Sequence, residues 1–124
     1  IGKYTAAARM NENKVLCTPA SVDTIPTCQL QEDHVSMGGT SSYKLETIVD
    51  NAEYILGIEL LTAVQAIDFN KPLKLSPTTQ KLYDEFRQHF TFMEQDRVMS
   101  DDMERARVYC AENRAKWIEQ FGLE

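Results

Sequence analysis

The sequence has no long apolar run, little cysteine and almost no histidine, and each shortage excludes a class of protein. No stretch approaches the roughly 18 apolar residues of a membrane-spanning helix, so no membrane span is predicted. Cys17, Cys28 and Cys110 are odd in number and form no Cys-x-x-Cys pair, which excludes a disulfide framework and a zinc knuckle. His34 and His89 lie too far apart in sequence to form a spaced metal motif. We therefore predict no metal site.

Basic residues are also scarce. Lys and Arg total 13 against 19 Asp and Glu, for a formal net charge of -6, and the basic residues are scattered. This distribution disfavours nucleic acid and anionic membranes as partners. The first residues, Ile1 to Tyr4, lack the apolar core of a secretion signal, so we expect a cytoplasmic protein with reduced thiols. The absence of an initial methionine indicates either processing or a longer parent chain.

The 124 residues, 43% of them hydrophobic, are enough for one domain over 1–124. Good helix formers between Tyr4 and Lys14 predict a first helix. The segment 18–34 carries two prolines and no helical periodicity, which predicts an ordered loop with a short turn after Pro19. Loops this long within compact domains tend to be functional.

The dominant element is predicted over residues 42–69, after Gly38 and Gly39. Its apolar residues recur at steps of three and four: Leu45, Ile48, Val49, Ala52, Ile55, Leu56, Ala63, Val64 and Ile67. A helix of about 28 residues is roughly 40 Å long, which exceeds what a small globule would cover. Between Ile55 and Ile67 the apolar residues surround most of the helix, so we predict an all-α bundle of long helices.

Two shorter helices are expected to follow. Ser76 and Pro77 supply an N-cap and a first helical residue, and Ser100 is predicted to cap the last helix. The expected apolar stripes are Leu82, Phe86 and Phe90 on one helix and Met103, Ala106, Cys110, Trp117 and Phe121 on the other. We interpret His89 as a packed, hydrogen-bonded core or boundary residue. The acidic residues between Glu94 and Glu104 are interpreted as a solvated surface.

The strongest candidate for chemistry is the polar string Gln31-Glu32-Asp33-His34, followed by Val35, Ser36 and Met37. Such side chains are costly to bury without partners, so they are either solvated or placed to meet a ligand. Desolvation would raise the pKa of the Glu32 carboxyl toward a range useful for proton transfer. Gln31 can both donate and accept hydrogen bonds, and His34 is either a base or a partner that locks the loop. Taken alone, the string is more often a capping turn and identifies no reaction.

A wider pattern is more specific. Four segments occur in order: Glu12–Lys14, Pro19–Thr27, Gln31–Met37 and Ile58–Phe69. Together they resemble the C-terminal part of the histidine ammonia-lyases, a branch of the aromatic amino acid lyase family. The resemblance is strong from Ala6 to Pro72. Beyond it, Asp96-Arg97 and Ser100-Asp101-Asp102 look like the closing loop and last helix of the family.

The resemblance implies an all-helical protein of the aspartase and fumarase type, assembled as a homotetramer. The implied activity is ammonia elimination from L-histidine to give urocanate, a step of histidine catabolism. The family's cofactor, methylidene-imidazolone, forms from an Ala-Ser-Gly triplet that this chain lacks, since Ala20-Ser21 is followed by Val22. The catalytic tyrosine and arginine positions also belong to upstream parts of the family. We therefore expect a C-terminal fragment that is inactive alone.

The resemblance also assigns site residues. Glu32 matches a position that lines the active site, with glutamate in histidine-type enzymes and usually glutamine in phenylalanine- or tyrosine-type enzymes. We predict Glu32 as the catalytic residue, and Gln31 and Glu32 as substrate-binding residues. A charge-assisted hydrogen bond to the imidazole is worth roughly 1.5 to 3 kcal/mol. Asp33 and His34 are expected to hold the loop.

Two alternatives remain open. The chain could be a non-catalytic helical module that keeps a lyase-like fold as an assembly surface. It could also belong to a phenylalanine- or tyrosine-type lyase, although the Asn-Gln-Asp pattern of phenylalanine-type enzymes is absent. The length of the natural reading frame, and an upstream Ala-Ser-Gly in it, would separate enzyme from module.

Overall fold

The computed structural model describes residues 2–22, 28–31 and 36–122. In these ranges every regular element is helical: α1 (Gly2–Leu16), the single-turn η1 (Cys28–Leu30), α2 (Gly38–Phe69), α3 (Pro77–His89) and α4 (Ser100–Phe121). No strand occurs in them. The prediction of an all-α fold built on long helices is therefore confirmed.

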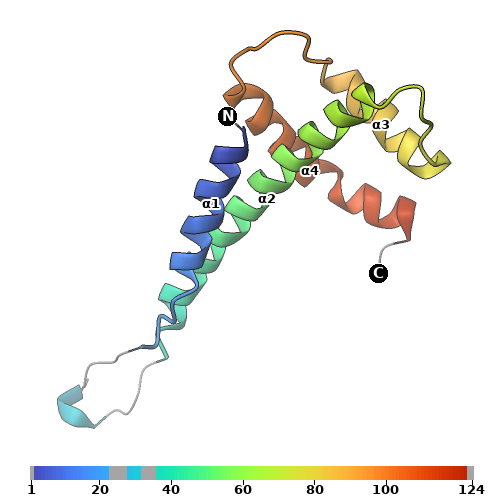
Figure 1. The fold of residues 1–124 in the computed structure, drawn as a ribbon. Helices are drawn as coiled ribbons and strands as arrows, with labels where there is room; N and C mark the ends of the chain where they lie inside the picture. Colours follow the sequence, from blue (N-terminus) through green and yellow to red (C-terminus); the bar gives the residue numbers. More distant parts are fainter. Residues whose placement is uncertain (1, 23–27, 32–35, 123–124) are drawn as a thin grey trace.

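Helices α1 and α2 form an antiparallel pair that projects as an arm from a head made by the second half of α2, α3 and α4 (Figure 1). Helix α2 has 32 residues, so it is about 48 Å long and starts four residues earlier than predicted. Met37, with φ of 53°, precedes it in the left-handed conformation. The single turn η1, in the connection from α1 to α2, lies beyond the far end of the arm (Figure 1).

The hydrophobic core lies in the head. Val64, Phe86, Phe90 and Ala106 are buried together, with Tyr109 packed against them. The Phe86 and Phe90 rings stack with centroids 4.3 Å apart, and the Tyr109 ring meets the Phe86 ring edge-on at 5.6 Å. The apolar stripes predicted for the last two helices thus meet across the core.

Two predictions at the ends of helices have different outcomes. The Ser76 side chain accepts a hydrogen bond from the Thr79 backbone N–H, and Pro77 is the first residue of α3, as predicted. The predicted N-cap at Ser100 is wrong. Met99 occupies that position, and its backbone accepts from the Met103 N–H. The Ser100 hydroxyl points instead to the Asp101 carboxylate at 3.3 Å, because Ser100 is already inside the helix.

Two surface predictions also need correction. Asp102 is only 8% exposed, so the acidic run is not wholly solvated; its carboxylate pairs with Arg97 at 2.8 Å. His89 is an exposed boundary residue whose ring lies 5.1 Å from the Tyr109 ring. The hydrogen bond at His89 uses its backbone carbonyl, which accepts from Arg105, rather than its imidazole.

Candidate functional site

Of the two residues of the predicted site, the structure describes Gln31, which follows η1 in the connection from α1 to α2. The Gln31 backbone N–H donates to the Cys28 carbonyl oxygen at 3.1 Å, which closes η1, and the Gln31 side chain is exposed. Cys28 and Gln29 have positive φ angles of 48° and 56°, so both residues of this turn adopt a left-handed backbone conformation that is uncommon outside glycine. Glu32, with its neighbours 33–35, lies outside the described residues. The structure therefore places Gln31 but not Glu32.

The base of this loop is tied to α2. The Lys44 ammonium donates to the Thr18 carbonyl oxygen, just after the end of α1. A cavity of about 190 Å³ lies beside this contact, lined by residues of 16–20 and 41–48. On the other side of the loop, the Ser41 N–H and hydroxyl both donate to the Met37 carbonyl at 3.1 and 3.3 Å. Both ends of the loop are thus held at the start of α2.

A buried asparagine connects the two helices of the arm. Asn51, only 2% exposed, accepts from Arg9 Nη1 at 2.6 Å and donates to Glu12 Oε2 at 2.8 Å and to Asn13 Oδ1 at 2.9 Å. Asn13 in turn donates to the Ile48 carbonyl at 3.2 Å. These bonds satisfy both the amide oxygen and the amide nitrogen of Asn51.

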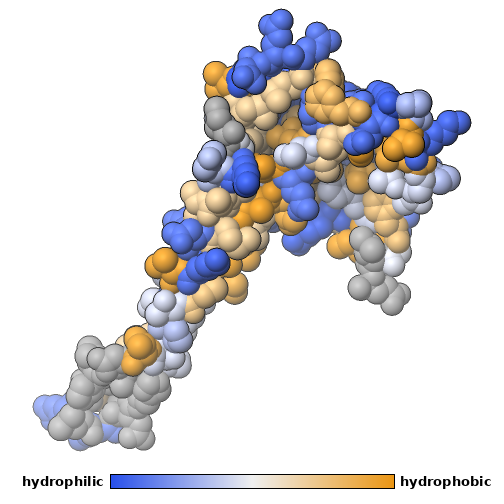
Figure 2. All heavy atoms as spheres, in the orientation of Figure 1, coloured by the Kyte–Doolittle hydropathy of each residue, from blue (hydrophilic) through white to orange (hydrophobic). Residues whose placement is uncertain are grey.

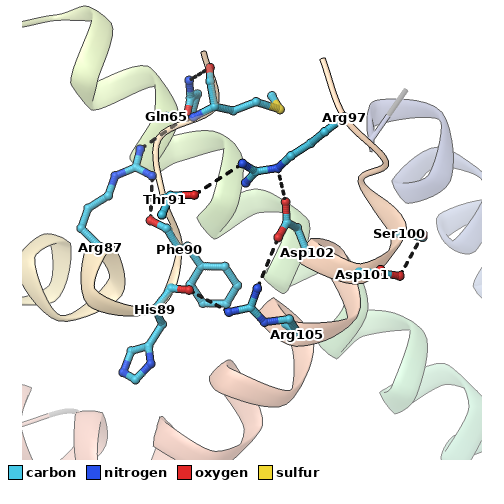
Figure 3. A network of polar contacts seen from close by, with 11 residues as sticks. Gln65, Arg87, His89, Phe90, Thr91, Arg97, Ser100, Asp101, Asp102 and Arg105 are labelled. Carbon is cyan, nitrogen blue, oxygen red and sulfur yellow. Dashed lines mark hydrogen bonds and ion pairs between the residues drawn. The ribbon is translucent and has the colours of Figure 1, made fainter. Parts of the chain in front are cut away.

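The head contains a separate network of arginines and carboxylates (Figure 3). Asp102 pairs with Arg97 at 2.8 Å and with Arg105 at 3.6 Å. Arg87 pairs with Asp68, and Gln65 binds the Met93 backbone through both its side-chain atoms at 3.0 and 3.2 Å. The loop between α3 and α4 is thereby fastened to α2.

Asp68 is the most strongly shifted acid of the described part. Burial alone raises the pKa of its carboxyl, but hydrogen bonds from Lys71, Tyr83 and Arg87 lower that pKa to about 2. Near neutral pH the carboxylate is therefore charged and holds these three hydrogen bonds. A group in this state stabilises the fold and does not transfer protons, so we assign no catalytic role to Asp68.

The described residues offer few other groups for chemistry. They contain no cluster of three or more His, Cys, Asp or Glu side chains that could hold a metal ion. Cys17 and Cys28 are exposed free thiols, and burial raises the pKa of the half-buried Cys110 thiol. No described helix has the length and hydrophobicity needed to cross a membrane. The loop at the end of the arm remains the candidate site.

Comparison with known proteins identifies the fold and its family. Residues 1–88 match the model of the family described as aromatic amino acid lyase. The chain belongs to the aromatic amino acid lyase family. The resemblance read from the four sequence segments is therefore confirmed.

Relatives within this family are similar over most of the chain. A probable histidine ammonia-lyase from Thermoplasma acidophilum is 50% identical over 86% of the chain and 21% of its own length. The histidine ammonia-lyase of Homo sapiens is 40% identical over 100% of the chain and 20% of its own length. The crystal structure of the Trypanosoma cruzi histidine ammonia-lyase superposes with a TM-score of 0.84 at 43% identity, over 91% of this chain and 22% of that one. The chain thus spans about a fifth of the curated relatives that it matches.

Sequence reasoning missed two polar networks, one that joins α1 to α2 in the arm and one that joins α2 to α3 and to the loop before α4 in the head. Asn51 was absent from the helical pattern because that pattern was built from apolar residues only. Asp68 and Arg87 are far apart in sequence and follow no motif. A hint was available in Asn51 itself, which interrupts the apolar face of α2 between Ile48 and Ile55.

Proposed function

We propose that the chain is the C-terminal portion of a histidine ammonia-lyase, which eliminates ammonia from L-histidine to give urocanate. The observation that carries this proposal is the identity of 40 to 50% to proteins named histidine ammonia-lyase over 86 to 100% of the chain. A cytoplasmic location is part of the same proposal and rests on the composition of the chain.

Within this proposal, Glu32 and Gln31 contact the substrate. The Glu32 carboxylate accepts a charge-assisted hydrogen bond from the imidazole ring, and Gln31 orients the same ligand through its amide. The exposure of the Gln31 side chain supports this role, because its amide is open to a ligand. Glu32 is the next residue along the same loop.

The implied cofactor does not fit the chain taken by itself. Methylidene-imidazolone supplies an electrophile that activates the substrate amine as a leaving group, and it forms from an Ala-Ser-Gly triplet. The only Ala-Ser pair here is Ala20-Ser21, followed by Val22. Since the chain spans about a fifth of its relatives, we propose that another part of the same protein carries the triplet. The residues of this chain then contribute substrate binding.

We also propose that the protein is a homotetramer in which α2 packs among the same helices of other subunits. Apolar side chains show on the surface of the arm (Figure 2). On α2, Leu45 is 60% exposed, Val49 44% and Leu56 55%. Large aliphatic side chains that are exposed near one another on one helix favour burial against a partner. In a closed symmetric homo-oligomer, the other subunits supply this partner.

The test uses the full-length protein that contains this chain. Purified protein should convert L-histidine to urocanate, followed by ultraviolet absorbance, and should act far more slowly on phenylalanine and tyrosine. Glu32→Gln should lower kcat/KM for histidine by about tenfold or more, equivalent to the loss of about 1.4 kcal/mol or more of transition-state binding. Glu119→Gln, the same neutralisation at an exposed position of α4, is the matched control.

Three outcomes would contradict the proposal. A protein with no turnover of any aromatic amino acid would support the non-catalytic module. A preference for phenylalanine or tyrosine would support the other lyase type. Full histidine turnover in Glu32→Gln would show that the carboxylate is not a substrate contact.

A further inference from the structure

The contact between α1 and α2 is unusually polar. Helix α1 contains no buried residue. The residues of α1 that are half-buried follow one helical face: Gly2, Thr5, Ala6, Arg9, Asn13 and Leu16. Only two of these six have aliphatic side chains, so the apolar contact of α1 against α2 is small. Hydrophobic packing therefore does little to fix the register of α1 against α2.

Polar contacts replace that packing and all pass through or near one residue. We call Arg9, Glu12, Asn13 and Asn51 the polar seam. Asn51 is bonded to the other three at 2.6 to 2.9 Å, and it is the only buried one of the four. The Arg9 guanidinium also lies over the Tyr54 ring, 3.8 Å from its centroid, one turn further along α2. These bonds have fixed partners, so a slip of one helical turn, about 5.4 Å, would break all of them.

The loop that carries Gln31 leaves from the ends of these two helices. Asn13 lies four residues before Cys17, and its side chain also binds the Ile48 carbonyl of α2. Lys44 lies four residues before Ile48, nearer to the loop, and its ammonium donates to the Thr18 carbonyl oxygen. The register of α1 against α2 therefore sets the position of the loop base.

We infer that Asn51 is a positioning residue: through the polar seam it fixes the register of α1 against α2, and thereby the place of the loop base at residues 17–18 and 36–37, from which the chain extends to Gln31. This inference rests on the proposed function for its effect on catalysis. A single buried polar residue that fixes helix register is well attested in coiled coils. A displacement of about 1 Å at a catalytic site can cost on the order of a hundredfold in rate, so a remote residue that sets the register affects turnover.

The main test compares Asn51→Leu with Val64→Ala in the full-length protein. Asn51→Leu removes every side-chain hydrogen bond of Asn51 and keeps the same number of side-chain heavy atoms in the same branched arrangement. Val64→Ala leaves a cavity in the head core of the same helix, away from α1, and serves as a destabilised control. Well below both unfolding temperatures, Asn51→Leu should lower kcat/KM for histidine by about tenfold to a hundredfold, whereas Val64→Ala should retain wild-type kinetics. Equal losses in the two variants would mean that Asn51 acts only through stability, and would overturn the inference.

Hydrogen exchange supplies a readout that does not depend on activity. Backbone amides at residues 17, 18, 20–22 and 28–31 should exchange faster in Asn51→Leu than in the wild type and in Val64→Ala. Unchanged exchange there would overturn the inference even if histidine turnover falls. Faster exchange in a protein that never acts on histidine would support the positioning role while the proposed function fails.

A second experiment exchanges the donor and the acceptor between Asn51 and Glu12, and it tests the inference even if Asn51→Leu does not fold. Asn51→Asp keeps the acceptor for Arg9 and places a carboxylate against Glu12, so it should lose activity and amide protection. Adding Glu12→Gln provides an amide that donates to the new carboxylate, and the double variant should recover much of both. A double variant no better than Asn51→Asp would overturn the inference.

Discussion

Gly57 of α2 lies directly against the backbone of Arg107 on α4. A Cβ built on Gly57 would stand 2.7 Å from the Arg107 nitrogen and 3.0 Å from the Ala106 carbonyl carbon. Both distances are shorter than van der Waals contact, and the obstacle is backbone, which cannot rotate away. Because Ala106 is also fully buried, the two helices cross at a point where only the smallest residues fit.

Gly57→Ala should therefore destabilise the protein although alanine is the better helix former. Overpacking typically costs about 1 to 3 kcal/mol, and a clash with backbone at 2.7 Å belongs in the upper part of this range, above the roughly 1 kcal/mol gained from helix propensity. The thermal midpoint of unfolding should fall by several degrees. Gly39→Ala is the matched control, since a Cβ there meets nothing within 4 Å, and it should leave the midpoint unchanged or raise it. A rise for Gly57→Ala would show that the crossing can open at little cost.

The second prediction concerns the pH dependence of stability at Asp68. The pKa of this carboxyl is about 2 in the folded chain against an ordinary value of 3.8. A lowered folded-state pKa stabilises the fold above pH 3.8, and this stabilisation is lost as the pH falls from 3.8 toward 2. Asp68→Asn should thus be less stable than wild type near neutral pH, by about 1 to 3 kcal/mol, with the difference shrinking in that acidic window.

Urea midpoints of both proteins, measured from neutral pH down to the acid limit of folding, would check this. Asp84→Asn is the control, because Asp84 is an exposed carboxylate on α3, held by a single surface hydrogen bond from Gln80. A constant gap between wild type and Asp68→Asn at all pH values would mean that the charge of Asp68 is not what stabilises the network.

The third prediction is that the isolated 124-residue chain will not release ammonia from histidine. The reaction needs an electrophile that activates the amine, and the chain has no Ala-Ser-Gly triplet from which to form one. Carboxylates such as Glu32 can accept protons but cannot replace an electrophile. Urocanate formation that follows the purified chain through a final sizing column would contradict this.

The sequence predicted elements whose signals are local. The helical periodicity of α2, the Ser76-Pro77 start of α3 and the apolar stripes that meet at Phe86 and Ala106 were all correct, because each depends on residues within about four positions of one another. The start of α4 was wrong by one residue, since Met99 already adopts helical backbone angles and no local signal marks this.

Contacts between distant residues could not be predicted in the same way. The bonds of Asn51 to Arg9 and of Asp68 to Arg87 depend on how whole helices are placed, and many surface polar residues look the same in sequence. The site itself was found through a resemblance. The polar string that begins at Gln31 identifies no reaction by itself, and the role of Glu32 remains a prediction.

The last prediction is that the isolated chain self-associates through α2. Leu56 is 55% exposed in the single chain, whereas Leu60, one turn later, packs against the core of Val64 and Phe86. Charging Leu60 would damage the fold, so the sharper variant is Leu56→Glu, because Leu56 is more than half exposed and lies outside the buried core cluster. Leu73→Glu is the control, since Leu73 is 76% exposed but lies after the end of α2.

Sedimentation over a concentration series should show oligomers for the wild-type chain and for Leu73→Glu. Leu56→Glu should shift the distribution toward monomer while the helical circular dichroism stays unchanged, because burying a charge at a copy-to-copy interface is costly and leaving it in water is not. The variant with both Leu56 and Leu60 charged should instead become monomeric or unfold. A compact and strictly monomeric wild-type chain would mean that the exposed side of α2 needs no partner, and that its apolar residues are tolerated in water.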